Sequence, residues 1–362
     1  MRVLLLSRYA RLGPSSRIRC YQYIDYLGAH SVDVTSAPFL DNDYIKSFVS
    51  DGTRRSNHVV AAFWKRVRWL LQARQYDLLW IQYEALPWLP DLLERWLMPS
   101  GVPYVVDYDD AQFHHYDLNS SPVVRWLLKD KHDGIMARAA AVVAGNDYLA
   151  TRARQAGAAE VVVLPSAVDV TRYRTSPNDT PSPFTIGWIG SPTTAPYLRV
   201  IADALREASR RLHARVVLVG SGPIDLPGVP VEVRTWQEST EADEIGAFDV
   251  GIMPLTDGPW EQGKCGFKLL QYMAAGIPAI ASPVGANRVI VRHGTTGFLA
   301  RTSEDWMQAF VALAESKDLR ARMGRAGRQV VEREYSTTVV APRLLDTLIR
   351  AARPVQQQHE TP

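Results

Sequence analysis

Short apolar runs alternate with amphipathic segments along the whole chain. In the first half these runs predict six β-strands: Val3–Leu6, Val32–Thr35, Leu78–Ile81, Tyr104–Val106, Ala141–Ala144 and Val161–Leu164. Helical periodicity fills the intervals, at Arg19–Leu27, His58–Arg74, Val123–Ala139 and Tyr148–Ala156. The third helix opens with a cap at Ser120 and Ser121 and a proline at its first position. This alternation predicts a parallel sheet with helices on both faces.

A proline-rich break, TSPNDTPSP, then interrupts the pattern over Thr175–Pro183. The alternation restarts with strands predicted at Thr185–Ile189, Arg215–Val219, Val231–Arg234, Val250–Met253 and Ile277–Ala281, and a last helical pattern covers Val339–Ala351. We therefore expect two Rossmann-like, doubly wound α/β domains, over residues 1–175 and 184–335, joined by a hinge at 176–183. A helix at 336–353 and a disordered tail at 354–362 would follow. Ligands bind at the carboxyl ends of such sheets, so we expect the domains to face a shared cleft.

Composition narrows the class of protein. Hydrophobic residues make up 46% of the 362 residues, which is typical of a globular protein, and a net charge of +3 is too small to indicate nucleic-acid binding. The two cysteines lack metal-ligand spacing and favour a reducing compartment. The N-terminal apolar run is typical of a strand rather than a signal peptide, and no run is long enough to span a membrane. We expect a cytoplasmic location.

Two loops lie where a strand enters a helix, a position at which backbone amides bind anions. The first, SRYARLGPSSRIR, turns at Gly13 among four arginines, and its serines can cap the helix; a solvated basic loop is the alternative. It is not a dinucleotide-binding GxGxxG motif. The second, GWIGSPTTAPY, combines Gly190 with the hydroxyl groups of Ser191, Thr193 and Thr194. This combination favours phosphate binding over a plain helix cap.

The most informative segment is WEQGKCGFKLLQYMAAGIPAIASPVGAN, from Trp260 to Asn287. A helix beginning near Gly266 would place Lys264 just ahead of it, Lys268 in its first turn and Gln271 on the same face as Lys268. Cations at a helix start are disfavoured by the helix dipole, so a bound diphosphate would explain them better than ordinary surface positions would. For Asn287, helix capping is favoured over a ligand contact.

This segment resembles the nucleotide-sugar motif of retaining glycosyltransferase family 4, the group-1 glycosyltransferases of GT-B fold. Residues 141–173, Gly187–Gly190, QYMAAGIPAIAS and GTTGFL resemble further parts of that family. The resemblance implies transfer of a hexose-type sugar from a nucleotide sugar to a glycan or lipid-linked acceptor, with retention, in bacterial cell-surface polysaccharide synthesis. It also implies that the C-terminal helix crosses back to the first domain.

The sequence departs from the family at several functional positions. The family's two glutamates, eight positions apart, correspond to Gly263 and Gln271, and Glu261 is out of register. The family's Arg and Lys after the first donor-domain strand are absent, so we expect Lys264 and Lys268 to replace them and Gln271 to hold the ribose. The family's first-domain histidine has no clear match in the comparable stretch, DYDDAQFHH.

We expect catalysis to involve the lysine pair and two carboxylates, namely Lys264, Lys268, Asp109 and Asp110. These carboxylates follow a first-domain strand, so they could orient the acceptor or act as a general base, or they could only cap a helix. We expect no metal. Donor binding is expected from Gly13, Gly190, Ser191, Thr193, Thr194, Trp236, Cys265, Gly266, Phe267 and Gln271. Trp236 could stack on the base or belong to the core.

Two other functions are compatible with the pattern. A nucleotide-sugar epimerase shares the architecture but needs carboxylates where this chain has lysines. A non-catalytic homologue, acting as a sugar-binding or partner subunit, would explain the missing glutamates, although the intact glycines and the lysines argue against it.

A basic amphipathic helix, Arg54–Arg74, suggests contact with an anionic membrane at its inner face. Its apolar stripe, Val60, Phe63, Val67, Leu70 and Leu71, would pack on the sheet. Arg66, Trp69 and Arg74 would then face outward. An ordinary sheet-covering helix with a solvated basic face is the alternative.

Overall fold

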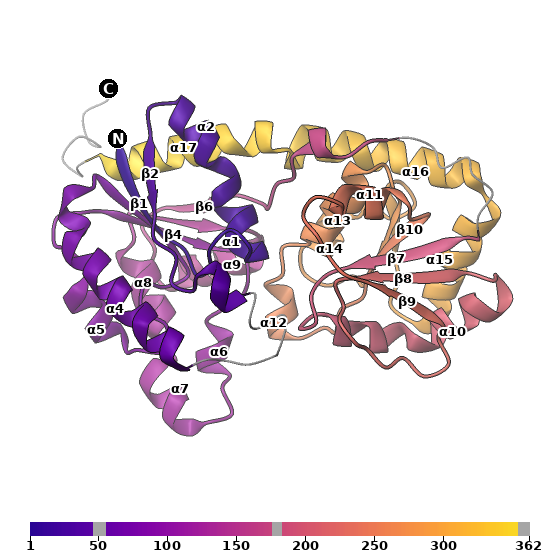
Figure 1. The fold of residues 1–362 in the computed structure, drawn as a ribbon, viewed down its shortest axis with the longest axis horizontal. Helices are drawn as coiled ribbons and strands as arrows, with labels where there is room; N and C mark the ends of the chain where they lie inside the picture. The colour runs from indigo at the N-terminus through magenta and orange to yellow at the C-terminus, as the bar shows by residue number, and fades with distance from the viewer. Residues whose placement is uncertain (46–55, 176–182, 354–362) are drawn as a thin grey trace. The chain divides into compact units, whose positions relative to one another are not determined.

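The computed structural model describes residues 1–45, 56–175 and 183–353, which form two parallel β-sheets with helices on both faces (Figure 1). Two compact units result: Met1–Ser166 with Val340–Pro362, and Ala167–Val339. The division falls after Ser166 rather than at residue 175, because Val168 and Tyr173 are buried in the core of the second unit. The predicted tail and all but the last residue of the predicted hinge lie outside the described residues.

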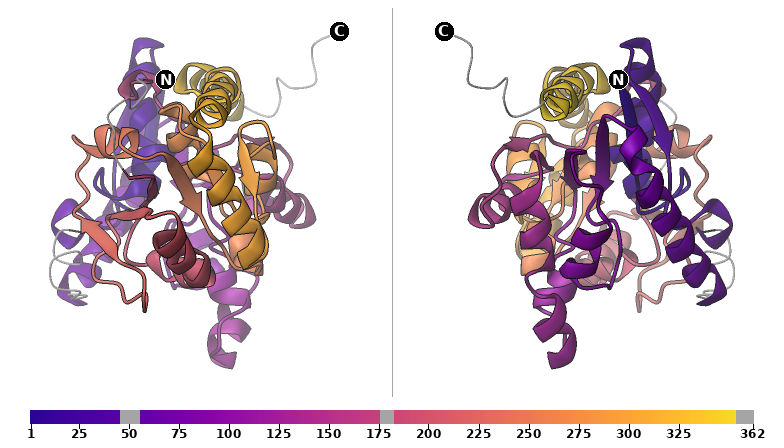
Figure 2. Two further views of the ribbon diagram at one scale, coloured as in Figure 1. Left: turned by 90° about the vertical axis from the view of Figure 1, so that its right-hand side faces the viewer. Right: turned by 90° about the vertical axis from the view of Figure 1, so that its left-hand side faces the viewer.

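The first unit has the strand order β2-β1-β3-β4-β5-β6, with every pairing parallel. Its strands are β1 (Arg2–Leu6), β2 (Asp33–Ser36), β3 (Leu78–Gln82), β4 (Tyr104–Tyr108), β5 (Ala141–Ala144) and β6 (Val161–Val163). Its helices are α1 (Pro14–Arg19), α2 (Ile24–Ala29), α4 (Ser56–Gln72), α5 (Asp91–Leu97), α6 (His114–Asp117), α7 (Pro122–Leu128), α8 (Lys131–Arg138) and α9 (Asp147–Gln155). Figure 2 shows helices on either side of this sheet.

The C-terminal helix, α17 (Thr337–Ala352), belongs to the first unit from Val340 onward. Arg343 donates a hydrogen bond of 2.9 Å to the carbonyl oxygen of Val163, and Arg350 pairs with Glu160 at 2.8 Å. Leu344 and Leu348 are fully buried. Helix α17 therefore packs beside the last strand of the first sheet.

The second unit has the strand order β12-β11-β10-β7-β8-β9, again wholly parallel. Its strands are β7 (Thr185–Ile189), β8 (Arg215–Val219), β9 (Val231–Arg234), β10 (Val250–Met253), β11 (Ala279–Ala281) and β12 (Gly297–Leu299). Its helices are α10 (Ala202–Arg211), α11 (Glu241–Gly246), α12 (Pro259–Gln262), α13 (Phe267–Ala274), α14 (Asn287–Ile290), α15 (Ser303–Glu315) and α16 (Lys317–Val330), with a 3₁₀ helix at Ala195–Ile201. Both units are therefore Rossmann-like and doubly wound, as the sequence predicts.

The pattern of apolar runs locates every strand except β12, whose three residues follow a glycine turn. Two predicted helices are interrupted. The pattern over Arg19–Leu27 forms a 3₁₀ helix at Tyr21–Tyr23 and the start of α2, because the chain turns at Cys20. The pattern over Val123–Ala139 forms α7 and α8, because the chain turns at Lys129 and Asp130. Ser121 caps α7 ahead of Pro122, as the sequence predicts.

The orientation predicted for α4 is wrong. Its inner face is Ala62, Arg66 and Leu70, whereas Val60 and Leu71 are 58% and 70% exposed. Arg66 turns inward because one guanidinium nitrogen donates to the carbonyl oxygen of Ser7 at 2.8 Å and the group lies over the ring of Phe39. Burial lowers the pKa of Arg66 to about 9, so the side chain stays charged at neutral pH. Arg66 is therefore not a surface cation, and Trp69 is half-buried.

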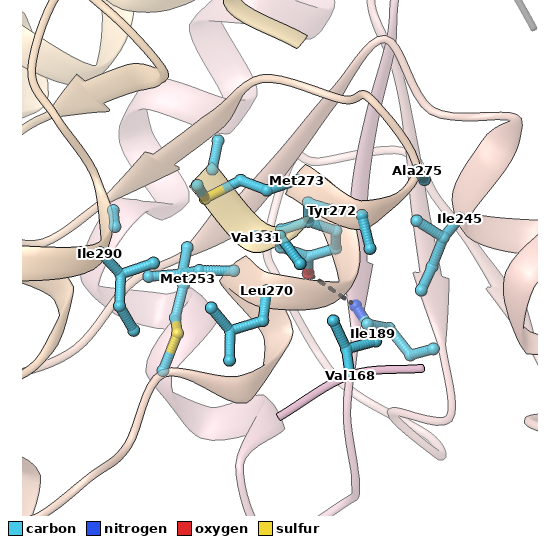
Figure 3. Close-up of a cluster of buried hydrophobic side chains, with 14 of the residues drawn as sticks. Val168, Ile189, Ile245, Met253, Leu270, Tyr272, Met273, Ala275, Ile290 and Val331 are labelled. Carbon is cyan, nitrogen blue, oxygen red and sulfur yellow. Dashed lines mark hydrogen bonds between the residues drawn. The ribbon is translucent and has the colours of Figure 1, made fainter. Parts of the chain in front are cut away.

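Helix α13 packs against the middle of the second sheet through Tyr272 (Figure 3). The Tyr272 hydroxyl accepts a hydrogen bond from the amide of Ile189 on β7 and donates one to the carbonyl of Ile252 on β10, both at 3.2 Å. The ring lies over Gly251, where an added Cβ would come within 2.2 Å of the ring carbon Cγ. Because Gly251 has no side chain, α13 can lie close to the sheet.

We expect Gly251→Ala to lower the free energy of unfolding by about 2 kcal/mol, since the new methyl group overpacks the buried Tyr272 ring. Thermal and urea unfolding of the purified variant measure this. Gly246→Ala, in a helix with open space around its Cβ, is the matched control and should be neutral or slightly stabilising. Equal stability of the two variants would contradict this account of α13 packing.

Candidate active site

In the second unit, the sheet order reverses between β7 and β10, which are neighbouring strands. The loop after β7 and the segment from β10 to α13 both leave the carboxyl end of the sheet at this point. In open α/β sheets this switch point is where ligands bind. The sequence-predicted loop at Gly190 and the lysine segment are therefore brought together.

The two lysines line one small pocket with aromatic and apolar side chains. Gly266 adopts a left-handed conformation (φ 67°), and α13 begins at Phe267, so Lys264 precedes the helix and Lys268 lies in its first turn, as predicted. The ammonium nitrogen of Lys268 lies 5.3 Å from the ring centre of Trp188, and that of Lys264 lies 5.4 Å from that of Trp260. A lysine ammonium group over an aromatic face is attracted by the ring quadrupole, whose face is electron-rich. Both side chains are half-buried, which argues against ordinary solvated surface lysines.

Gly190 makes room for this arrangement. An added Cβ would lie 2.4 Å from the Trp188 ring and 2.8 Å from Cε of Lys268. The sequence predicts that this glycine lets a ligand approach the backbone. The structure shows that the missing side chain also leaves space for Trp188 and Lys268.

The three predicted hydroxyl groups lie together on the loop after β7. The Ser191 and Thr193 hydroxyls are 2.8 Å apart, and Thr194 Oγ1 accepts from the amide of Ser191 at 3.2 Å. They form a turn rather than a side-chain cap on the following 3₁₀ helix. The hydroxyl groups therefore lie beside the lysine pocket, which Thr194 and Tyr197 also line.

A buried hydrogen-bonded chain runs from α13 to the loop after β9. Gln271 donates from its amide to the hydroxyl of Tyr173 at 3.1 Å, and that hydroxyl reaches Glu241 at 3.4 Å. Trp236 donates from its indole nitrogen to the other Glu241 oxygen at 2.7 Å and packs half-buried against the core. Tyr173 and Glu241 were not singled out from the sequence, because nothing local marks a tyrosine 98 residues from its partner.

Two further side chains adjoin the start of α13. Cys265 is buried, with its thiol 3.7 Å from the carbonyl oxygen of Gly263. Asn287 is fully buried and donates to the carbonyl of Ser282 at 3.1 Å, so it does not cap α14 as expected. Its oxygen has no hydrogen-bond partner among the described residues, and an added Cβ on Gly266 would lie 3.5 Å from it. A buried unpaired acceptor beside Gly266 suits a ligand hydroxyl group.

In the first unit, Asp109 gathers hydroxyl groups from two other strand ends. Ser15, on α1, donates to its carboxylate at 2.8 Å, and Tyr83, after β3, donates to it as well. Asp109 caps no helix, which removes one of the alternatives for it. Tyr83 adopts a positive φ of 64°, a strained conformation that clusters at functional sites. Burial and the charges of Asp109 and Asp110 raise the pKa of Tyr83, so its hydroxyl stays protonated.

Asp107, two residues before Asp109, forms a buried ion pair instead. Its carboxylate pairs with Arg19 at 2.8 Å, and both side chains are buried. Burial, opposed by Arg19, raises the pKa of Asp107 to about 6. Asp107 is therefore a structural partner of α1. Within the described ranges, no group of three His, Cys, Asp or Glu side chains is placed to hold a metal ion.

The first predicted loop turns at Gly13 for a packing reason. An added Cβ there would lie 2.3 Å from Cβ of Tyr9. Gly13 precedes α1, and the two serines do not cap that helix. Instead, the Ser16 hydroxyl donates a hydrogen bond of 2.6 Å to the side-chain oxygen of Gln82, and the Ser15 hydroxyl donates one to the carboxylate of Asp109.

A cluster of buried ion pairs stabilises the loop that follows Tyr83. Glu84 pairs with Lys131 at 2.7 Å and with Arg8 at 3.1 Å, and Tyr116 donates to it at 2.9 Å. Lys131 also lies 3.3 Å from Glu94, whose carboxylate accepts from the amides of residues 85 and 86. Burial alone would raise the pKa of Glu84, but His132, Lys131 and Arg8 lower it to about 2.

A histidine that the sequence left unassigned is also held in place. His114 contacts Asp117 at 2.8 Å through Nδ1 and the Tyr148 hydroxyl at 2.8 Å through Nε2. These contacts leave both ring nitrogens engaged, so His114 orients α6 against α9.

Two doubly wound, wholly parallel units in one chain are the architecture of the GT-B fold. Residues 183–316 match the family model of the group 1 glycosyl transferases, and residues 14–167 match that of a glycosyl transferase 4-like domain. These matches span most of the chain, which belongs to the group-1 glycosyltransferases of family 4.

Known relatives include mannosyltransferases of mycobacteria. The chain is 26% identical over 244 residues to phosphatidyl-myo-inositol mannosyltransferase of Mycobacterium tuberculosis, covering 62% of each protein. It is 29% identical over 273 residues to the GDP-mannose-dependent alpha-(1-6)-phosphatidylinositol monomannoside mannosyltransferase of that species, covering 66% of this chain and 68% of the relative. The chain thus spans less than two thirds of the length of the first of these relatives.

Solved structures share the fold over nearly the whole chain. Anabaena HepE in complex with UDP-glucose superposes with a TM-score of 0.72 at 16% identity, over 96% of this chain and 99% of HepE. Sucrose-phosphate synthase from Thermosynechococcus elongatus gives a TM-score of 0.71 at 15% identity, over 98% and 100%. At these identities the likeness establishes the GT-B fold. Among the described helices, none is long and apolar enough to cross a membrane.

We expect Glu84→Gln to lower the free energy of unfolding by about 3 kcal/mol at pH 7, since half-buried Arg8 loses its counter-charge and buried Lys131 keeps only that of Glu94. Folding lowers the pKa of Glu84 from 4.5, so its stabilisation is complete above that value and is lost as the pH falls toward 2. The difference between wild type and variant should therefore narrow below pH 4.5. Urea unfolding across this range measures it.

Glu207→Gln is the control for that experiment, because Glu207 pairs with Arg210 on the surface. It should change stability little at any pH. A difference between wild type and Glu84→Gln that stays constant down to the lowest pH at which the protein is folded would contradict the assignment.

Proposed function

We propose that this chain transfers a hexose-type sugar from a nucleotide-sugar donor to a hydroxyl group of a glycan or lipid-linked acceptor, with retention of the anomeric configuration. The observation that carries the proposal is the placement of Lys264 and Lys268 at the start of α13, held over Trp260 and Trp188 at the switch point. Membership of the group-1 glycosyltransferases supports it.

In this proposal the donor diphosphate lies against the two ammonium groups and the first amides of α13. The bond between C1 of the sugar and the diphosphate oxygen breaks while the acceptor oxygen bonds to C1 on the same face. The acceptor proton passes to the departing diphosphate. Positive charge that is already in place at the leaving oxygen stabilises the transition state more than the ground state.

The remaining donor contacts follow from the same pocket. Ser191, Thr193 and Thr194 offer hydroxyl groups to the phosphates, and the unpaired oxygen of Asn287 accepts from a sugar hydroxyl. Trp236 and Gln271 lie on the buried chain toward β9, the side where Rossmann-like folds place the base and ribose.

The acceptor is assigned to the first unit. Asp109, with Ser15 and Tyr83 donating to it, forms a polar cluster that can accept a hydrogen bond from a sugar hydroxyl and orient it, with Asp110 beside it. The mannosyltransferase relatives are named for phosphatidylinositol acceptors, which supports a lipid-linked acceptor here and a role in surface polysaccharide or glycolipid synthesis. Such an acceptor would place the chain at the cytoplasmic face of a membrane.

We expect Lys264→Ala and Lys268→Ala each to lower donor turnover by about 10²–10³-fold, since each removes one cation from the leaving diphosphate. The measurement uses a panel of UDP-, GDP- and other nucleotide sugars, with release of the nucleoside diphosphate as readout. Calorimetry with UDP and GDP should show weaker binding by both variants.

Lys317→Ala is the matched control. Lys317 also lies in the first turn of a helix, α16, but is exposed and away from the switch point. It should behave as wild type. Donor binding without any turnover in the wild type would instead favour a non-catalytic sugar-binding protein, and conversion of the donor sugar to its epimer would favour an epimerase.

Turnover should persist in EDTA, because the two lysines supply the positive charge that a divalent cation would bring to the diphosphate. The measurement compares initial rates in EDTA with rates in added magnesium or manganese. Complete loss in EDTA, restored by either metal, would disprove the metal-independent mechanism. Lys264→Ala serves as a second comparison, since partial rescue by magnesium would show that the two cations act at the same place.

A further inference from the structure

The pocket that Lys264 and Lys268 line is small. Its volume is about 30 Å³. A cavity needs roughly 10–15 Å³ to hold one water molecule, so this pocket admits water but not a diphosphate. A segment that borders the pocket must therefore move before a diphosphate can contact both ammonium groups.

One hydrogen bond joins the two segments that border the pocket. The hydroxyl of Tyr197 donates to the carboxylate of Glu261 at 2.5 Å. Tyr197 lies on the 3₁₀ helix after β7 and lines the pocket, and Glu261 lies on α12, after β10. The ammonium nitrogen of Lys264 is 6.0 Å from the centre of the Tyr197 ring. A carboxylate, a hydroxyl donor and a cation are thus gathered at the edge of the pocket.

Helix α12 is held weakly by the rest of the second unit. Its four residues, Pro259–Gln262, include no buried side chain, and a glycine lies at each end. The side-chain oxygen of Gln262 accepts from the amide of Gly285 at 3.1 Å, which holds one end of α12. Helix α13, in contrast, is fixed in the core through Tyr272. Segments with few buried contacts open at low free energy, so α12 rather than α13 is the part that can move.

We propose that Glu261 holds, until a donor binds, the hydrogen-bonding position that a donor phosphate then takes. Carboxylate and phosphate oxygens are both anionic acceptors, so each can accept from the Tyr197 hydroxyl and each suits the nearby charge of Lys264. Donor binding exchanges the bond between Tyr197 and Glu261 for one between Tyr197 and a phosphate oxygen, as α12 moves outward. Tyr197 is thereby a donor-binding residue and Glu261 a competitor for the same site. The inference rests on the proposed function for the identity of the donor.

The exchange makes the site selective for a strongly anionic ligand. A ligand without negative charge cannot replace the carboxylate beside Lys264, so the Tyr197–Glu261 bond stays closed against it. The same bond lowers the apparent affinity for the donor, because only the open fraction of the protein is competent to bind. If Glu261 instead braced Tyr197 in the position that donor binding needs, its removal would weaken binding. The two roles therefore predict opposite signs.

The test is calorimetry of the full chain with UDP, GDP and inorganic pyrophosphate. Glu261→Gln and Glu261→Ala should each bind pyrophosphate, and whichever nucleotide the wild type binds, about three- to tenfold more tightly, since the competing carboxylate is gone. Tyr197→Phe loses both the competing bond and the phosphate contact, so its affinity should change less. In the Tyr197→Phe background, Glu261→Gln should add little or no gain.

Asp257→Asn is the matched control, since Asp257 is an exposed carboxylate four positions before Glu261. It should bind as wild type does, because charge at a distance is screened by salt. Hydrogen exchange of the amides of residues 262–264 should be faster in Glu261→Gln than in wild type before ligand is added. Circular dichroism shows that each variant is folded.

Equal or weaker pyrophosphate binding by Glu261→Gln overturns the proposal. So does an equal gain in Asp257→Asn, or a full gain in the Tyr197→Phe background, since either would show a general effect of charge. Tighter pyrophosphate binding by Glu261→Gln, with no turnover of any nucleotide sugar by the wild type, would uphold the exchange and refute the proposed function. Turnover by the wild type without a gain in Glu261→Gln would do the reverse.

Discussion

The position of Tyr272 between β7 and β10 is the constraint on which the donor site depends. Its hydroxyl bonds to both strands at the point where the sheet order reverses, and its ring requires glycine at position 251. Helix α13 is thereby fixed in height and rotation over the sheet. Lys268 lies one turn earlier on the same helix, so the distance between its ammonium group and the switch point is set by a hydrogen bond in the core. In the function we propose, a cation held on a rigid helix would need little reorganisation when charge develops on the leaving group.

The first unit fixes its polar cluster by a different means. Buried charges, not a buried tyrosine between strands, hold the loop after β3: Glu84 with Lys131 and Arg8, and Glu94 with two backbone amides. A buried ion pair need not add net stability, but the loss of one partner leaves the other charge buried without full compensation. The strained backbone of Tyr83 lies at the start of this loop. The cluster thus maintains a conformation that the tyrosine would not adopt unaided, and this conformation brings its hydroxyl group to Asp109.

The sequence was sufficient for those features that depend on local pattern. Eleven of the strands follow apolar runs, and the start of α13 follows from Gly266, whose positive φ ends the preceding turn. Two of the failures involve partners distant in sequence. Arg66 was placed on the surface of α4 because periodicity treats arginine as polar, whereas the carbonyl of Ser7 and the ring of Phe39 accept it inside. From the sequence, helix capping and acceptor orientation are equally compatible with Asp109. The structure shows that Ser15 and Tyr83, which follow two other strands, both donate hydrogen bonds to it.

Glu241 explains why this chain has glutamine at position 271, where its family has glutamate. Tyr173 has one hydroxyl hydrogen, which it directs to Glu241, and it accepts the amide hydrogen of Gln271. A glutamate at position 271 would offer no such hydrogen and would place a second carboxylate against the same hydroxyl, with Glu241 buried close by. Glutamine at 271 is therefore coupled to the presence of Glu241, which also holds Trp236. With the family's carboxylate absent from α13, that helix has no acidic side chain beside the two lysines at its start, which suits the contact with the donor diphosphate that we propose for them.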